Sequence, residues 1–294
     1  MFLDVLARFK DRESELALFH RMLKGETSKR ILCILDHREK GKTWLIWRLF
    51  HECKELGVPV VLLDFHRDRS GLSGDFGSVV SEVRGYLGDR CTPNICNCTA
   101  RMSLLSALSD MAAGGESPGV DFGQDNIFTG ANVRNIAGGN ILQVGAVFTG
   151  RLTPEQVAQQ QAEMGRALCR DLAALGRVVL LIDTFERAPD DTRAWLERWV
   201  FRSLHHELSH ALLVVAGRPE ECQPFFTQPR LWSDLITAID CLDPFSDDEI
   251  LAYYENCGLT VTAVEVSLLA IARTSPGRMA QIGDLLKQTQ GGMQ

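Results

Sequence analysis

The chain has 294 residues, of which 45% are hydrophobic, and a formal net charge of −7. This length suits one large α/β domain followed by a small helical one, and the apolar content allows a sizeable core. The acidic balance disfavours a nucleic-acid binder, and the longest apolar runs are too short to span a bilayer. The N-terminus lacks the pattern of a signal peptide, so we expect a cytoplasmic protein.

The most informative segment follows a predicted helix over residues 10–24. An apolar strand over residues 31–35 enters a charged turn that closes on Gly41-Lys42-Thr43, and an amphipathic helix follows. Backbone N–H groups and the dipole at a helix start favour a phosphate. We predict that Lys42 reaches the terminal phosphates of a nucleotide and that Thr43 holds Mg²⁺. The alternative is an ordinary strand-to-helix turn with an exposed lysine.

We expect the nucleotide to be bound here by five consecutive residues: Lys40, Gly41, Lys42, Thr43 and Trp44. The turn departs from the full phosphate-loop pattern, because Asp36 stands where a glycine is usual and Glu39 where a second is common. Glycine adopts positive φ without strain, and two carboxylates at these positions would repel an anion.

A second strand is predicted over residues 58–64, and helices are predicted over 76–88 and 101–112. Strands that alternate with helices predict a parallel sheet with right-handed crossovers. Three cysteines, at positions 91, 96 and 98, lie between the two helices. They could form a zinc site, but we prefer to interpret this segment as a loop with free thiols. Residues 113–150 are rich in Gly and Asn, which predicts either a flexible insertion or a hairpin that docks a partner.

A long helix is predicted from Pro154 to Leu175, with Thr153 as its N-cap. The next apolar run, residues 178–182, suits a strand buried on both faces and ends in Asp183. A carboxylate at the carboxyl end of a parallel strand can hold Mg²⁺, although Asp183 is also a plausible turn residue or helix cap.

Glu186 follows three residues after Asp183 and can polarise an attacking water, unless it is a solvated helix residue. A helix is predicted over 192–206, with Trp195 and Trp199 as core residues. The strand at 210–218 ends in Arg218, which can sense a terminal phosphate or can pair with Glu220 or Glu221.

From residue 243 the alternation of strands and helices stops. Ser246 and Glu249 form a capping box that opens a short helix, and further helices are predicted over 262–273 and 278–287. Arg278 begins the last of these, where it is a surface residue unless it reaches the nucleotide as the resemblance described next implies.

Together these segments resemble the P-loop ATPases of the signal-transducing STAND class, within the wider AAA+-like group, from Phe9 to about Leu286. The resemblance is carried by Phe9-Lys-Asp-Arg-Glu13, Gly41-Lys42-Thr43, Leu181-Ile-Asp-Thr-Phe-Glu186, Ala216-Gly-Arg218 and Leu242-Asp-Pro-Phe-Ser246. It implies an α/β P-loop NTPase fold, a three-layer parallel sheet over residues 1–240, and a helical lid over 241–294.

The resemblance also implies roles for individual residues. Lys42 and Thr43 would bind phosphate and Mg²⁺, Asp183 would support the Mg²⁺, and Arg218 and Arg278 would sense the nucleotide. Glu186 would be the catalytic carboxylate, because Thr184 stands where many relatives carry the catalytic acid.

We therefore expect an ATP-binding switch that uses ATP and Mg²⁺, hydrolyses slowly, and works with a protein partner or as a homo-oligomer. A non-hydrolysing protein-interaction module with a degenerate nucleotide site is the alternative that Asp36, Glu39 and Thr184 favour. A DNA-linked ATPase is a third possibility, which the acidic composition disfavours.

Overall fold

The computed structural model describes residues 12–66, 75–112, 153–227, 230–259, 279 and 281–286. The predicted insertion at 113–150, the predicted helix at 262–273 and Arg278 lie outside these ranges. The chain separates into two compact units, one made of residues 1–66, 179–187 and 212–294, and the other of residues 67–178 and 188–211. The boundary that we expected at residue 240 remains a prediction.

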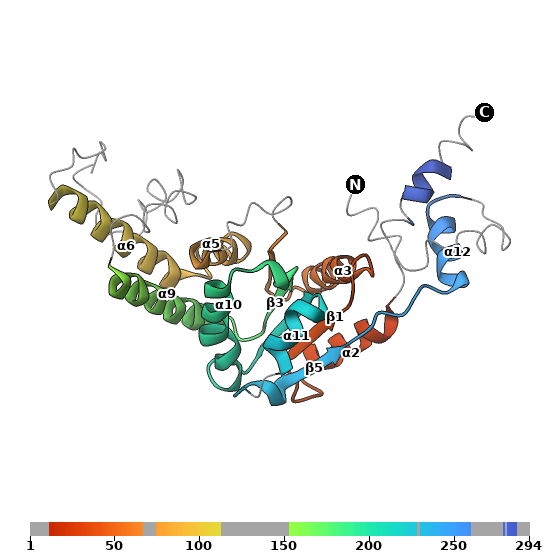
Figure 1. The fold of residues 1–294 in the computed structure, drawn as a ribbon, viewed down its shortest axis with the longest axis horizontal. Helices are drawn as coiled ribbons and strands as arrows, with labels where there is room; N and C mark the ends of the chain where they lie inside the picture. The colour runs from red at the N-terminus through yellow and green to blue at the C-terminus, as the bar shows by residue number, and fades with distance from the viewer. Residues whose placement is uncertain are drawn as a thin grey trace. The chain divides into compact units, whose positions relative to one another are not determined.

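The first unit is built on a five-stranded sheet in the order β2-β3-β4-β1-β5. Strands β1, β3 and β5 are labelled in Figure 1. Its strands are β1 Ile31–Leu35, β2 Val60–Asp64, β3 Val178–Asp183, β4 Ala211–Gly217 and β5 Ile236–Ile239. The pairs β1–β4, β1–β5 and β2–β3 are parallel, as the alternating pattern predicts. The α/β parallel-sheet fold expected of a P-loop NTPase is therefore confirmed, with β1 in the interior of the sheet.

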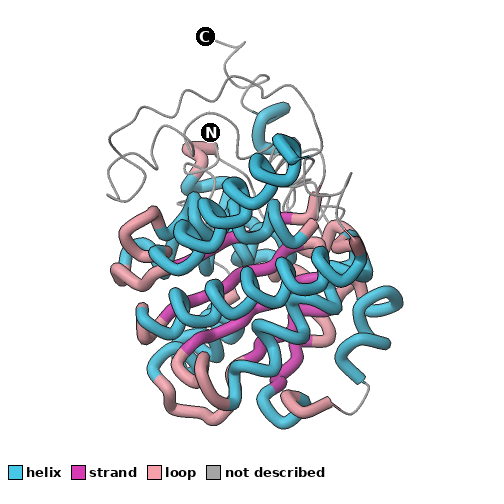
Figure 2. The backbone as a smooth tube through the Cα atoms, turned by 90° about the vertical axis from the view of Figure 1, so that its left-hand side faces the viewer, coloured by secondary structure: helices cyan, strands magenta, loops and turns pink. Residues whose placement is uncertain are grey.

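The burial of the strands explains why their sequences are continuous apolar runs. Every residue of β1, β2, β3 and β4 is buried, so both faces of the sheet are covered. Strand β5, at one edge, is partly exposed, and its short run of four residues was not predicted. Figure 2 shows the strands running alongside one another among the helices.

The first unit also contains helices and short helical turns. They are α2 Glu13–Lys24, α3 Lys42–Glu55, the 3₁₀ turn η1 Phe185–Arg187, α11 Pro219–Thr227, η4 Ser233–Leu235 and α12 Asp247–Asn256. Helix α12 begins with the predicted capping box, in which the Ser246 hydroxyl accepts from the Glu249 N–H and the Glu249 carboxylate accepts from the Ser246 N–H. A small apolar core that includes Phe245, Tyr254 and Met279 packs around this helix.

The second unit is helical. Its elements are α5 Phe76–Leu87, α6 Pro93–Ala112, α9 Pro154–Ala174, α10 Asp190–Leu196, the π turn η2 Glu197–Phe201 and the 3₁₀ turn η3 Arg202–His205. Thr153 caps α9 as predicted. Trp195 is buried, and its indole N–H donates to the Gln161 carbonyl at 3.0 Å.

The cysteine segment is not the loop that we predicted, because Cys96 and Cys98 lie within α6. The reason is a distant cap: the Asp171 carboxylate of α9 accepts from the backbone N–H groups of Asn94 at 3.0 Å and Ile95 at 2.8 Å, which satisfies the first turn of α6. The thiols are free. Within the described ranges, no group of three or more His, Cys, Asp or Glu side chains is arranged to hold a metal ion.

None of the helices in the described part of the chain has the length and apolar character needed to cross a membrane.

Candidate functional site

The loop between β1 and α3 places a lysine at the carboxyl edge of the sheet. Gly41 precedes α3 with φ 95°, and Glu39 adopts φ 64°. A left-handed conformation costs a residue other than glycine about 1–2 kcal/mol. Glu39 therefore adopts the positive-φ conformation for which the phosphate-loop pattern commonly has a glycine.

The Lys42 ammonium lies over this loop. Its Nζ donates to the Asp36 carbonyl at 2.5 Å and to the His37 carbonyl at 2.6 Å. Burial lowers the pKa of Lys42, while the charges of Glu186, Asp36 and Asp183 oppose that shift and the charge of Arg218 adds to it. The charge of Lys42 therefore interacts with the predicted acids Asp183 and Glu186 and with the predicted sensor Arg218.

Asp183 lies at the end of β3, and only 3% of it is exposed. Its carboxylate accepts from the Thr184 N–H at 2.8 Å and from the Thr43 hydroxyl. The pKa of Asp183 is raised to about 6. Burial is the main cause, the charges of Asp64 and Glu186 add to it, and the hydrogen bonds from Thr43 and Thr184 oppose it. Thr43 and Asp183, the two predicted Mg²⁺ ligands, thus lie close enough for the Thr43 hydroxyl to lower the pKa of the carboxyl.

Asp64 is a functional candidate that we did not include among the predicted site residues. It ends β2, is buried, and is in register with Asp183 on the neighbouring parallel strand. Its Oδ1 accepts from the His66 N–H at 2.8 Å. The sequence does show that the predicted strand at 58–64 ends in an acidic residue. It does not show the register that places this carboxylate beside that of Asp183.

Glu186 and Arg218, the predicted catalytic acid and the predicted sensor, bind each other. Thr184 has φ 56°, and this left-handed turn followed by η1 leads the chain from Asp183 to Glu186. Arg218 Nε lies 3.1 Å from Glu186 Oε1, and Arg218 Nη1 lies 3.0 Å from Glu221 Oε1. Only 5% of the Glu186 side chain is exposed, so the solvated alternative is wrong.

One carboxylate oxygen of this pair is unused. Glu186 Oε2 is buried and has no hydrogen-bond partner among the described residues. An unpaired buried carboxylate oxygen is costly and marks a position where a water or ligand donor is expected. The same oxygen faces Gly217, since a Cβ added at that glycine would lie 3.2 Å from it.

The residues at this site follow the expected pattern in part. Lys42, Thr43, Asp183, Glu186 and Arg218 come together at the carboxyl ends of β1, β3 and β4. Lys40 and Trp44 flank Gly41 and Thr43 in the same loop and helix, and both are partly exposed. Arg278 lies outside the described residues, so its role remains a prediction.

The ionisation of Asp183 predicts a pH-dependent stability. Its pKa rises from the ordinary value of 3.8 to about 6. Between these values the unfolded chain releases the proton first, so stability falls as pH rises through this window and stays low above it. Two pKa units correspond to about 3 kcal/mol. Without metal or nucleotide, Asp183→Asn is therefore expected to melt several degrees higher than the wild type at pH 8 and at the same temperature near pH 4.

This prediction is measured by thermal melting in chelator across pH 4–8. Asp240→Asn, which removes an exposed carboxylate just after β5, is the control and should leave the profile unchanged. Parallel profiles for the wild type and Asp183→Asn would show that Asp183 ionises normally in the folded chain.

A second prediction concerns the close packing beneath Arg218. A Cβ at Gly217 would clash with the Cys222 Sγ, and Cys222 is fully buried in α11. Gly217→Ala is therefore expected to destabilise the chain by about 1–3 kcal/mol, as overpacking does. Adding Cys222→Ala should recover part of this loss, because it removes the clashing sulfur. Chemical denaturation of the two single variants and the double variant measures the coupling, and strict additivity would contradict the contact.

Comparison with known proteins leaves the family open. No family model matches the chain, and no curated protein matches it. Among solved structures, the chain is similar to the Walker-type ATPase PABY2304 of Pyrococcus abyssi, with 15% identity, a TM-score of 0.49, and coverage of 96% of this chain and 68% of that one. At this level of similarity we draw no functional conclusion from the match.

Proposed function

We propose that the chain is an ATP-binding switch of the STAND class, which binds ATP with Mg²⁺ and hydrolyses it slowly. One observation carries this proposal: Lys42, Asp183, Glu186 and Arg218, which come from three separate segments of the sequence, share one site at the carboxyl edge of a parallel sheet. Ligands of α/β proteins bind at this edge.

The residues present fit a magnesium nucleotide. The Thr43 hydroxyl and the Asp183 carboxylate are hard oxygen donors, and Asp64 adds a second buried carboxylate beside them. Mg²⁺ usually takes one or two carboxylates together with substrate phosphates, so a larger protein cluster is not required. When bound, the ion would neutralise charge on the phosphates.

Each remaining residue has a distinct task in this proposal. Lys42 binds the terminal phosphates. To do so, its ammonium gives up the carbonyls of Asp36 and His37 and takes phosphate oxygens as acceptors instead. Arg218 binds the terminal phosphate, and this contact competes with its ion pair to Glu186. Released from that pair, the Glu186 carboxylate can accept a proton from an attacking water. The switch then shifts between two states according to the phosphate present, and passes this change to a protein partner or a second copy of the chain.

Isothermal titration calorimetry tests the binding step. Mg²⁺ with ATP should bind the wild-type chain, and ATP in chelator should bind more weakly. Absence of heat and of competition with a fluorescent ATP analogue would overturn the proposal.

The second candidate is a non-hydrolysing interaction module, and the Glu186–Arg218 ion pair favours it. If ATP leaves this pair intact, Glu186 stays paired with Arg218 and is not available to orient water. Phosphate release under single-turnover conditions separates the two: slow release supports the hydrolysing switch, whereas binding without release supports the interaction module.

A further inference from the structure

Asp36 occupies a position where the loop pattern has a glycine, and the structure gives its carboxylate two contacts that glycine cannot make. Only 3% of Asp36 is exposed. Its N–H donates to the Gly217 carbonyl at 3.3 Å, and its own carbonyl accepts from Lys42 Nζ at 2.5 Å. Its Oδ1 accepts from the His37 N–H at 2.7 Å. The carboxylate therefore does not face a phosphate as a repelling group, which was our concern from the sequence.

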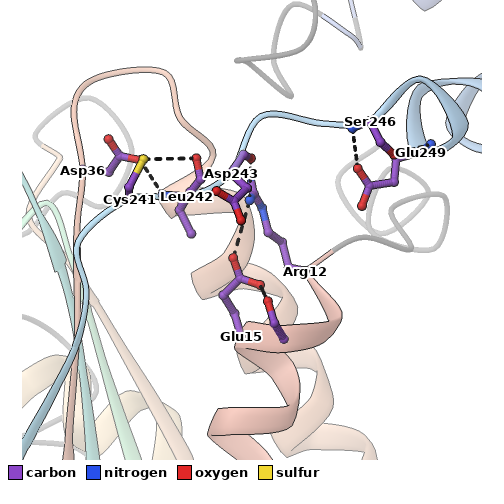
Figure 3. A network of polar contacts seen from close by, with 9 residues as sticks. Arg12, Glu15, Asp36, Cys241, Leu242, Asp243, Ser246 and Glu249 are labelled. Carbon is purple, nitrogen blue, oxygen red and sulfur yellow. Dashed lines mark hydrogen bonds and ion pairs between the residues drawn. The ribbon is translucent and has the colours of Figure 1, made fainter.

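The second carboxylate oxygen reaches much further along the chain. Asp36 Oδ2 accepts from the backbone N–H of Leu242 at 2.8 Å, and Leu242 is buried. Leu242 belongs to the linker, residues 240–246, which joins β5 to α12 (Figure 3). The first residue of the phosphate loop is thus hydrogen-bonded to the segment that leads into the C-terminal helix.

The linker is held at a second point by Arg12. Arg12 Nη1 donates to the Asp243 carbonyl at 2.7 Å, and the guanidinium lies 4.9 Å from the centre of the Phe245 ring. Phe245 is part of the apolar core around α12. The linker residue bound by Asp36 is therefore only three residues from Phe245, which packs in the core around α12.

We propose that Asp36 is a positioning residue that couples the phosphate-binding lysine to the linker 240–246. This inference rests on the proposed nucleotide site. The two ends of the coupling meet in one residue, since the carbonyl of Asp36 holds Lys42 and its side chain holds Leu242. A phosphate that draws Lys42 away removes one restraint on the Asp36 peptide, and its carboxylate moves with that peptide. Phosphate binding and linker position then depend on each other, as reciprocal coupling requires.

Hydrogen exchange measured by mass spectrometry on the full chain tests this coupling. In the wild type, Mg²⁺ with ATP should raise the exchange rate of the peptide that contains Leu242 by about tenfold. In Asp36→Gly, exchange at this peptide should be fast with or without ATP. Asp243→Asn, which removes an exposed carboxylate from the same linker, is the control and should respond as the wild type does.

The outcomes separate this inference from the proposed function. An Asp36→Gly variant whose Leu242 peptide still responds to ATP overturns the coupling and leaves ATP binding untouched. A wild type that does not bind ATP overturns both. If Asp36→Gly does not fold, Asp36→Asn keeps the shape of the side chain and carries one acceptor oxygen for two N–H donors. Its nucleotide response should be clearly reduced, and a full response would overturn the coupling.

Discussion

Replacing Lys42 by alanine is expected to weaken ATP binding about a hundredfold, which corresponds to about 3 kcal/mol. The ammonium is the basic group of the loop that lies among the carboxylates Asp36, Asp183 and Glu186. Without it, the phosphates would lose the cation that lies beside Asp183 and Glu186. The loss should be measured by calorimetry with Mg²⁺ and ATP, alongside the melting temperature of the free variant.

Lys54→Ala is the matched control for this change. Lys54 is an exposed lysine in the last turn of the same helix, and it contacts Phe50 rather than the loop. Its removal should leave the dissociation constant within twofold of the wild-type value. Equal affinities for Lys42→Ala and the wild type would remove the loop from the nucleotide site.

The sheet could be predicted because the information is local. Each of the residue ranges 31–35, 178–182 and 210–218 is an apolar run bounded by polar residues, and such runs become strands buried on both faces. The polar residue after each run then falls at the carboxyl edge of the sheet. This is why Asp183 and Arg218 could be assigned to one site before their distances were known.

The parts that could not be predicted depend on partners far away in the sequence. The orientation of Asp36 is set by the N–H of Leu242, which lies 206 residues later. The start of α6 is set by the carboxylate of Asp171, and without it the segment from Cys91 to Cys98 resembles a loop. No local pattern reports such contacts, because one residue supplies the donor and a distant one the acceptor.

The Glu186–Arg218 pair shows how function is read differently once contacts are known. From the sequence, each residue also had a non-functional interpretation. Glu186 could be a solvated helix residue, and Arg218 could pair with Glu220 or Glu221. The structure retains the Glu221 pair and adds a second, buried one to Glu186. A cation held between two carboxylates can exchange one of them for a phosphate at little cost in charge, so the pair is suited to sense a terminal phosphate.

Glu186→Gln is expected to slow single-turnover phosphate release about a hundredfold or more while ATP affinity stays within threefold of the wild type. The amide keeps the shape of the side chain and one acceptor oxygen for Arg218, but it cannot take a proton from water. Binding is spared because Lys42, Thr43 and Asp183 are unchanged. Rapid quench of a preformed complex measures the release, and calorimetry measures the affinity.

Glu221→Gln provides the matched control, because it neutralises the other carboxylate partner of Arg218. Glu221 is 46% exposed and pairs with Arg218 at 3.0 Å, whereas Glu186 is 5% exposed and lies within the field of Lys42 and Asp183. Glu221→Gln should therefore release phosphate within twofold of the wild-type rate. If both variants slow release equally, the effect comes from the position of Arg218 and Glu186 is not the base. If neither slows it, the carboxylate that orients water lies elsewhere, and Asp64 is the next buried carboxylate beside Asp183 to test.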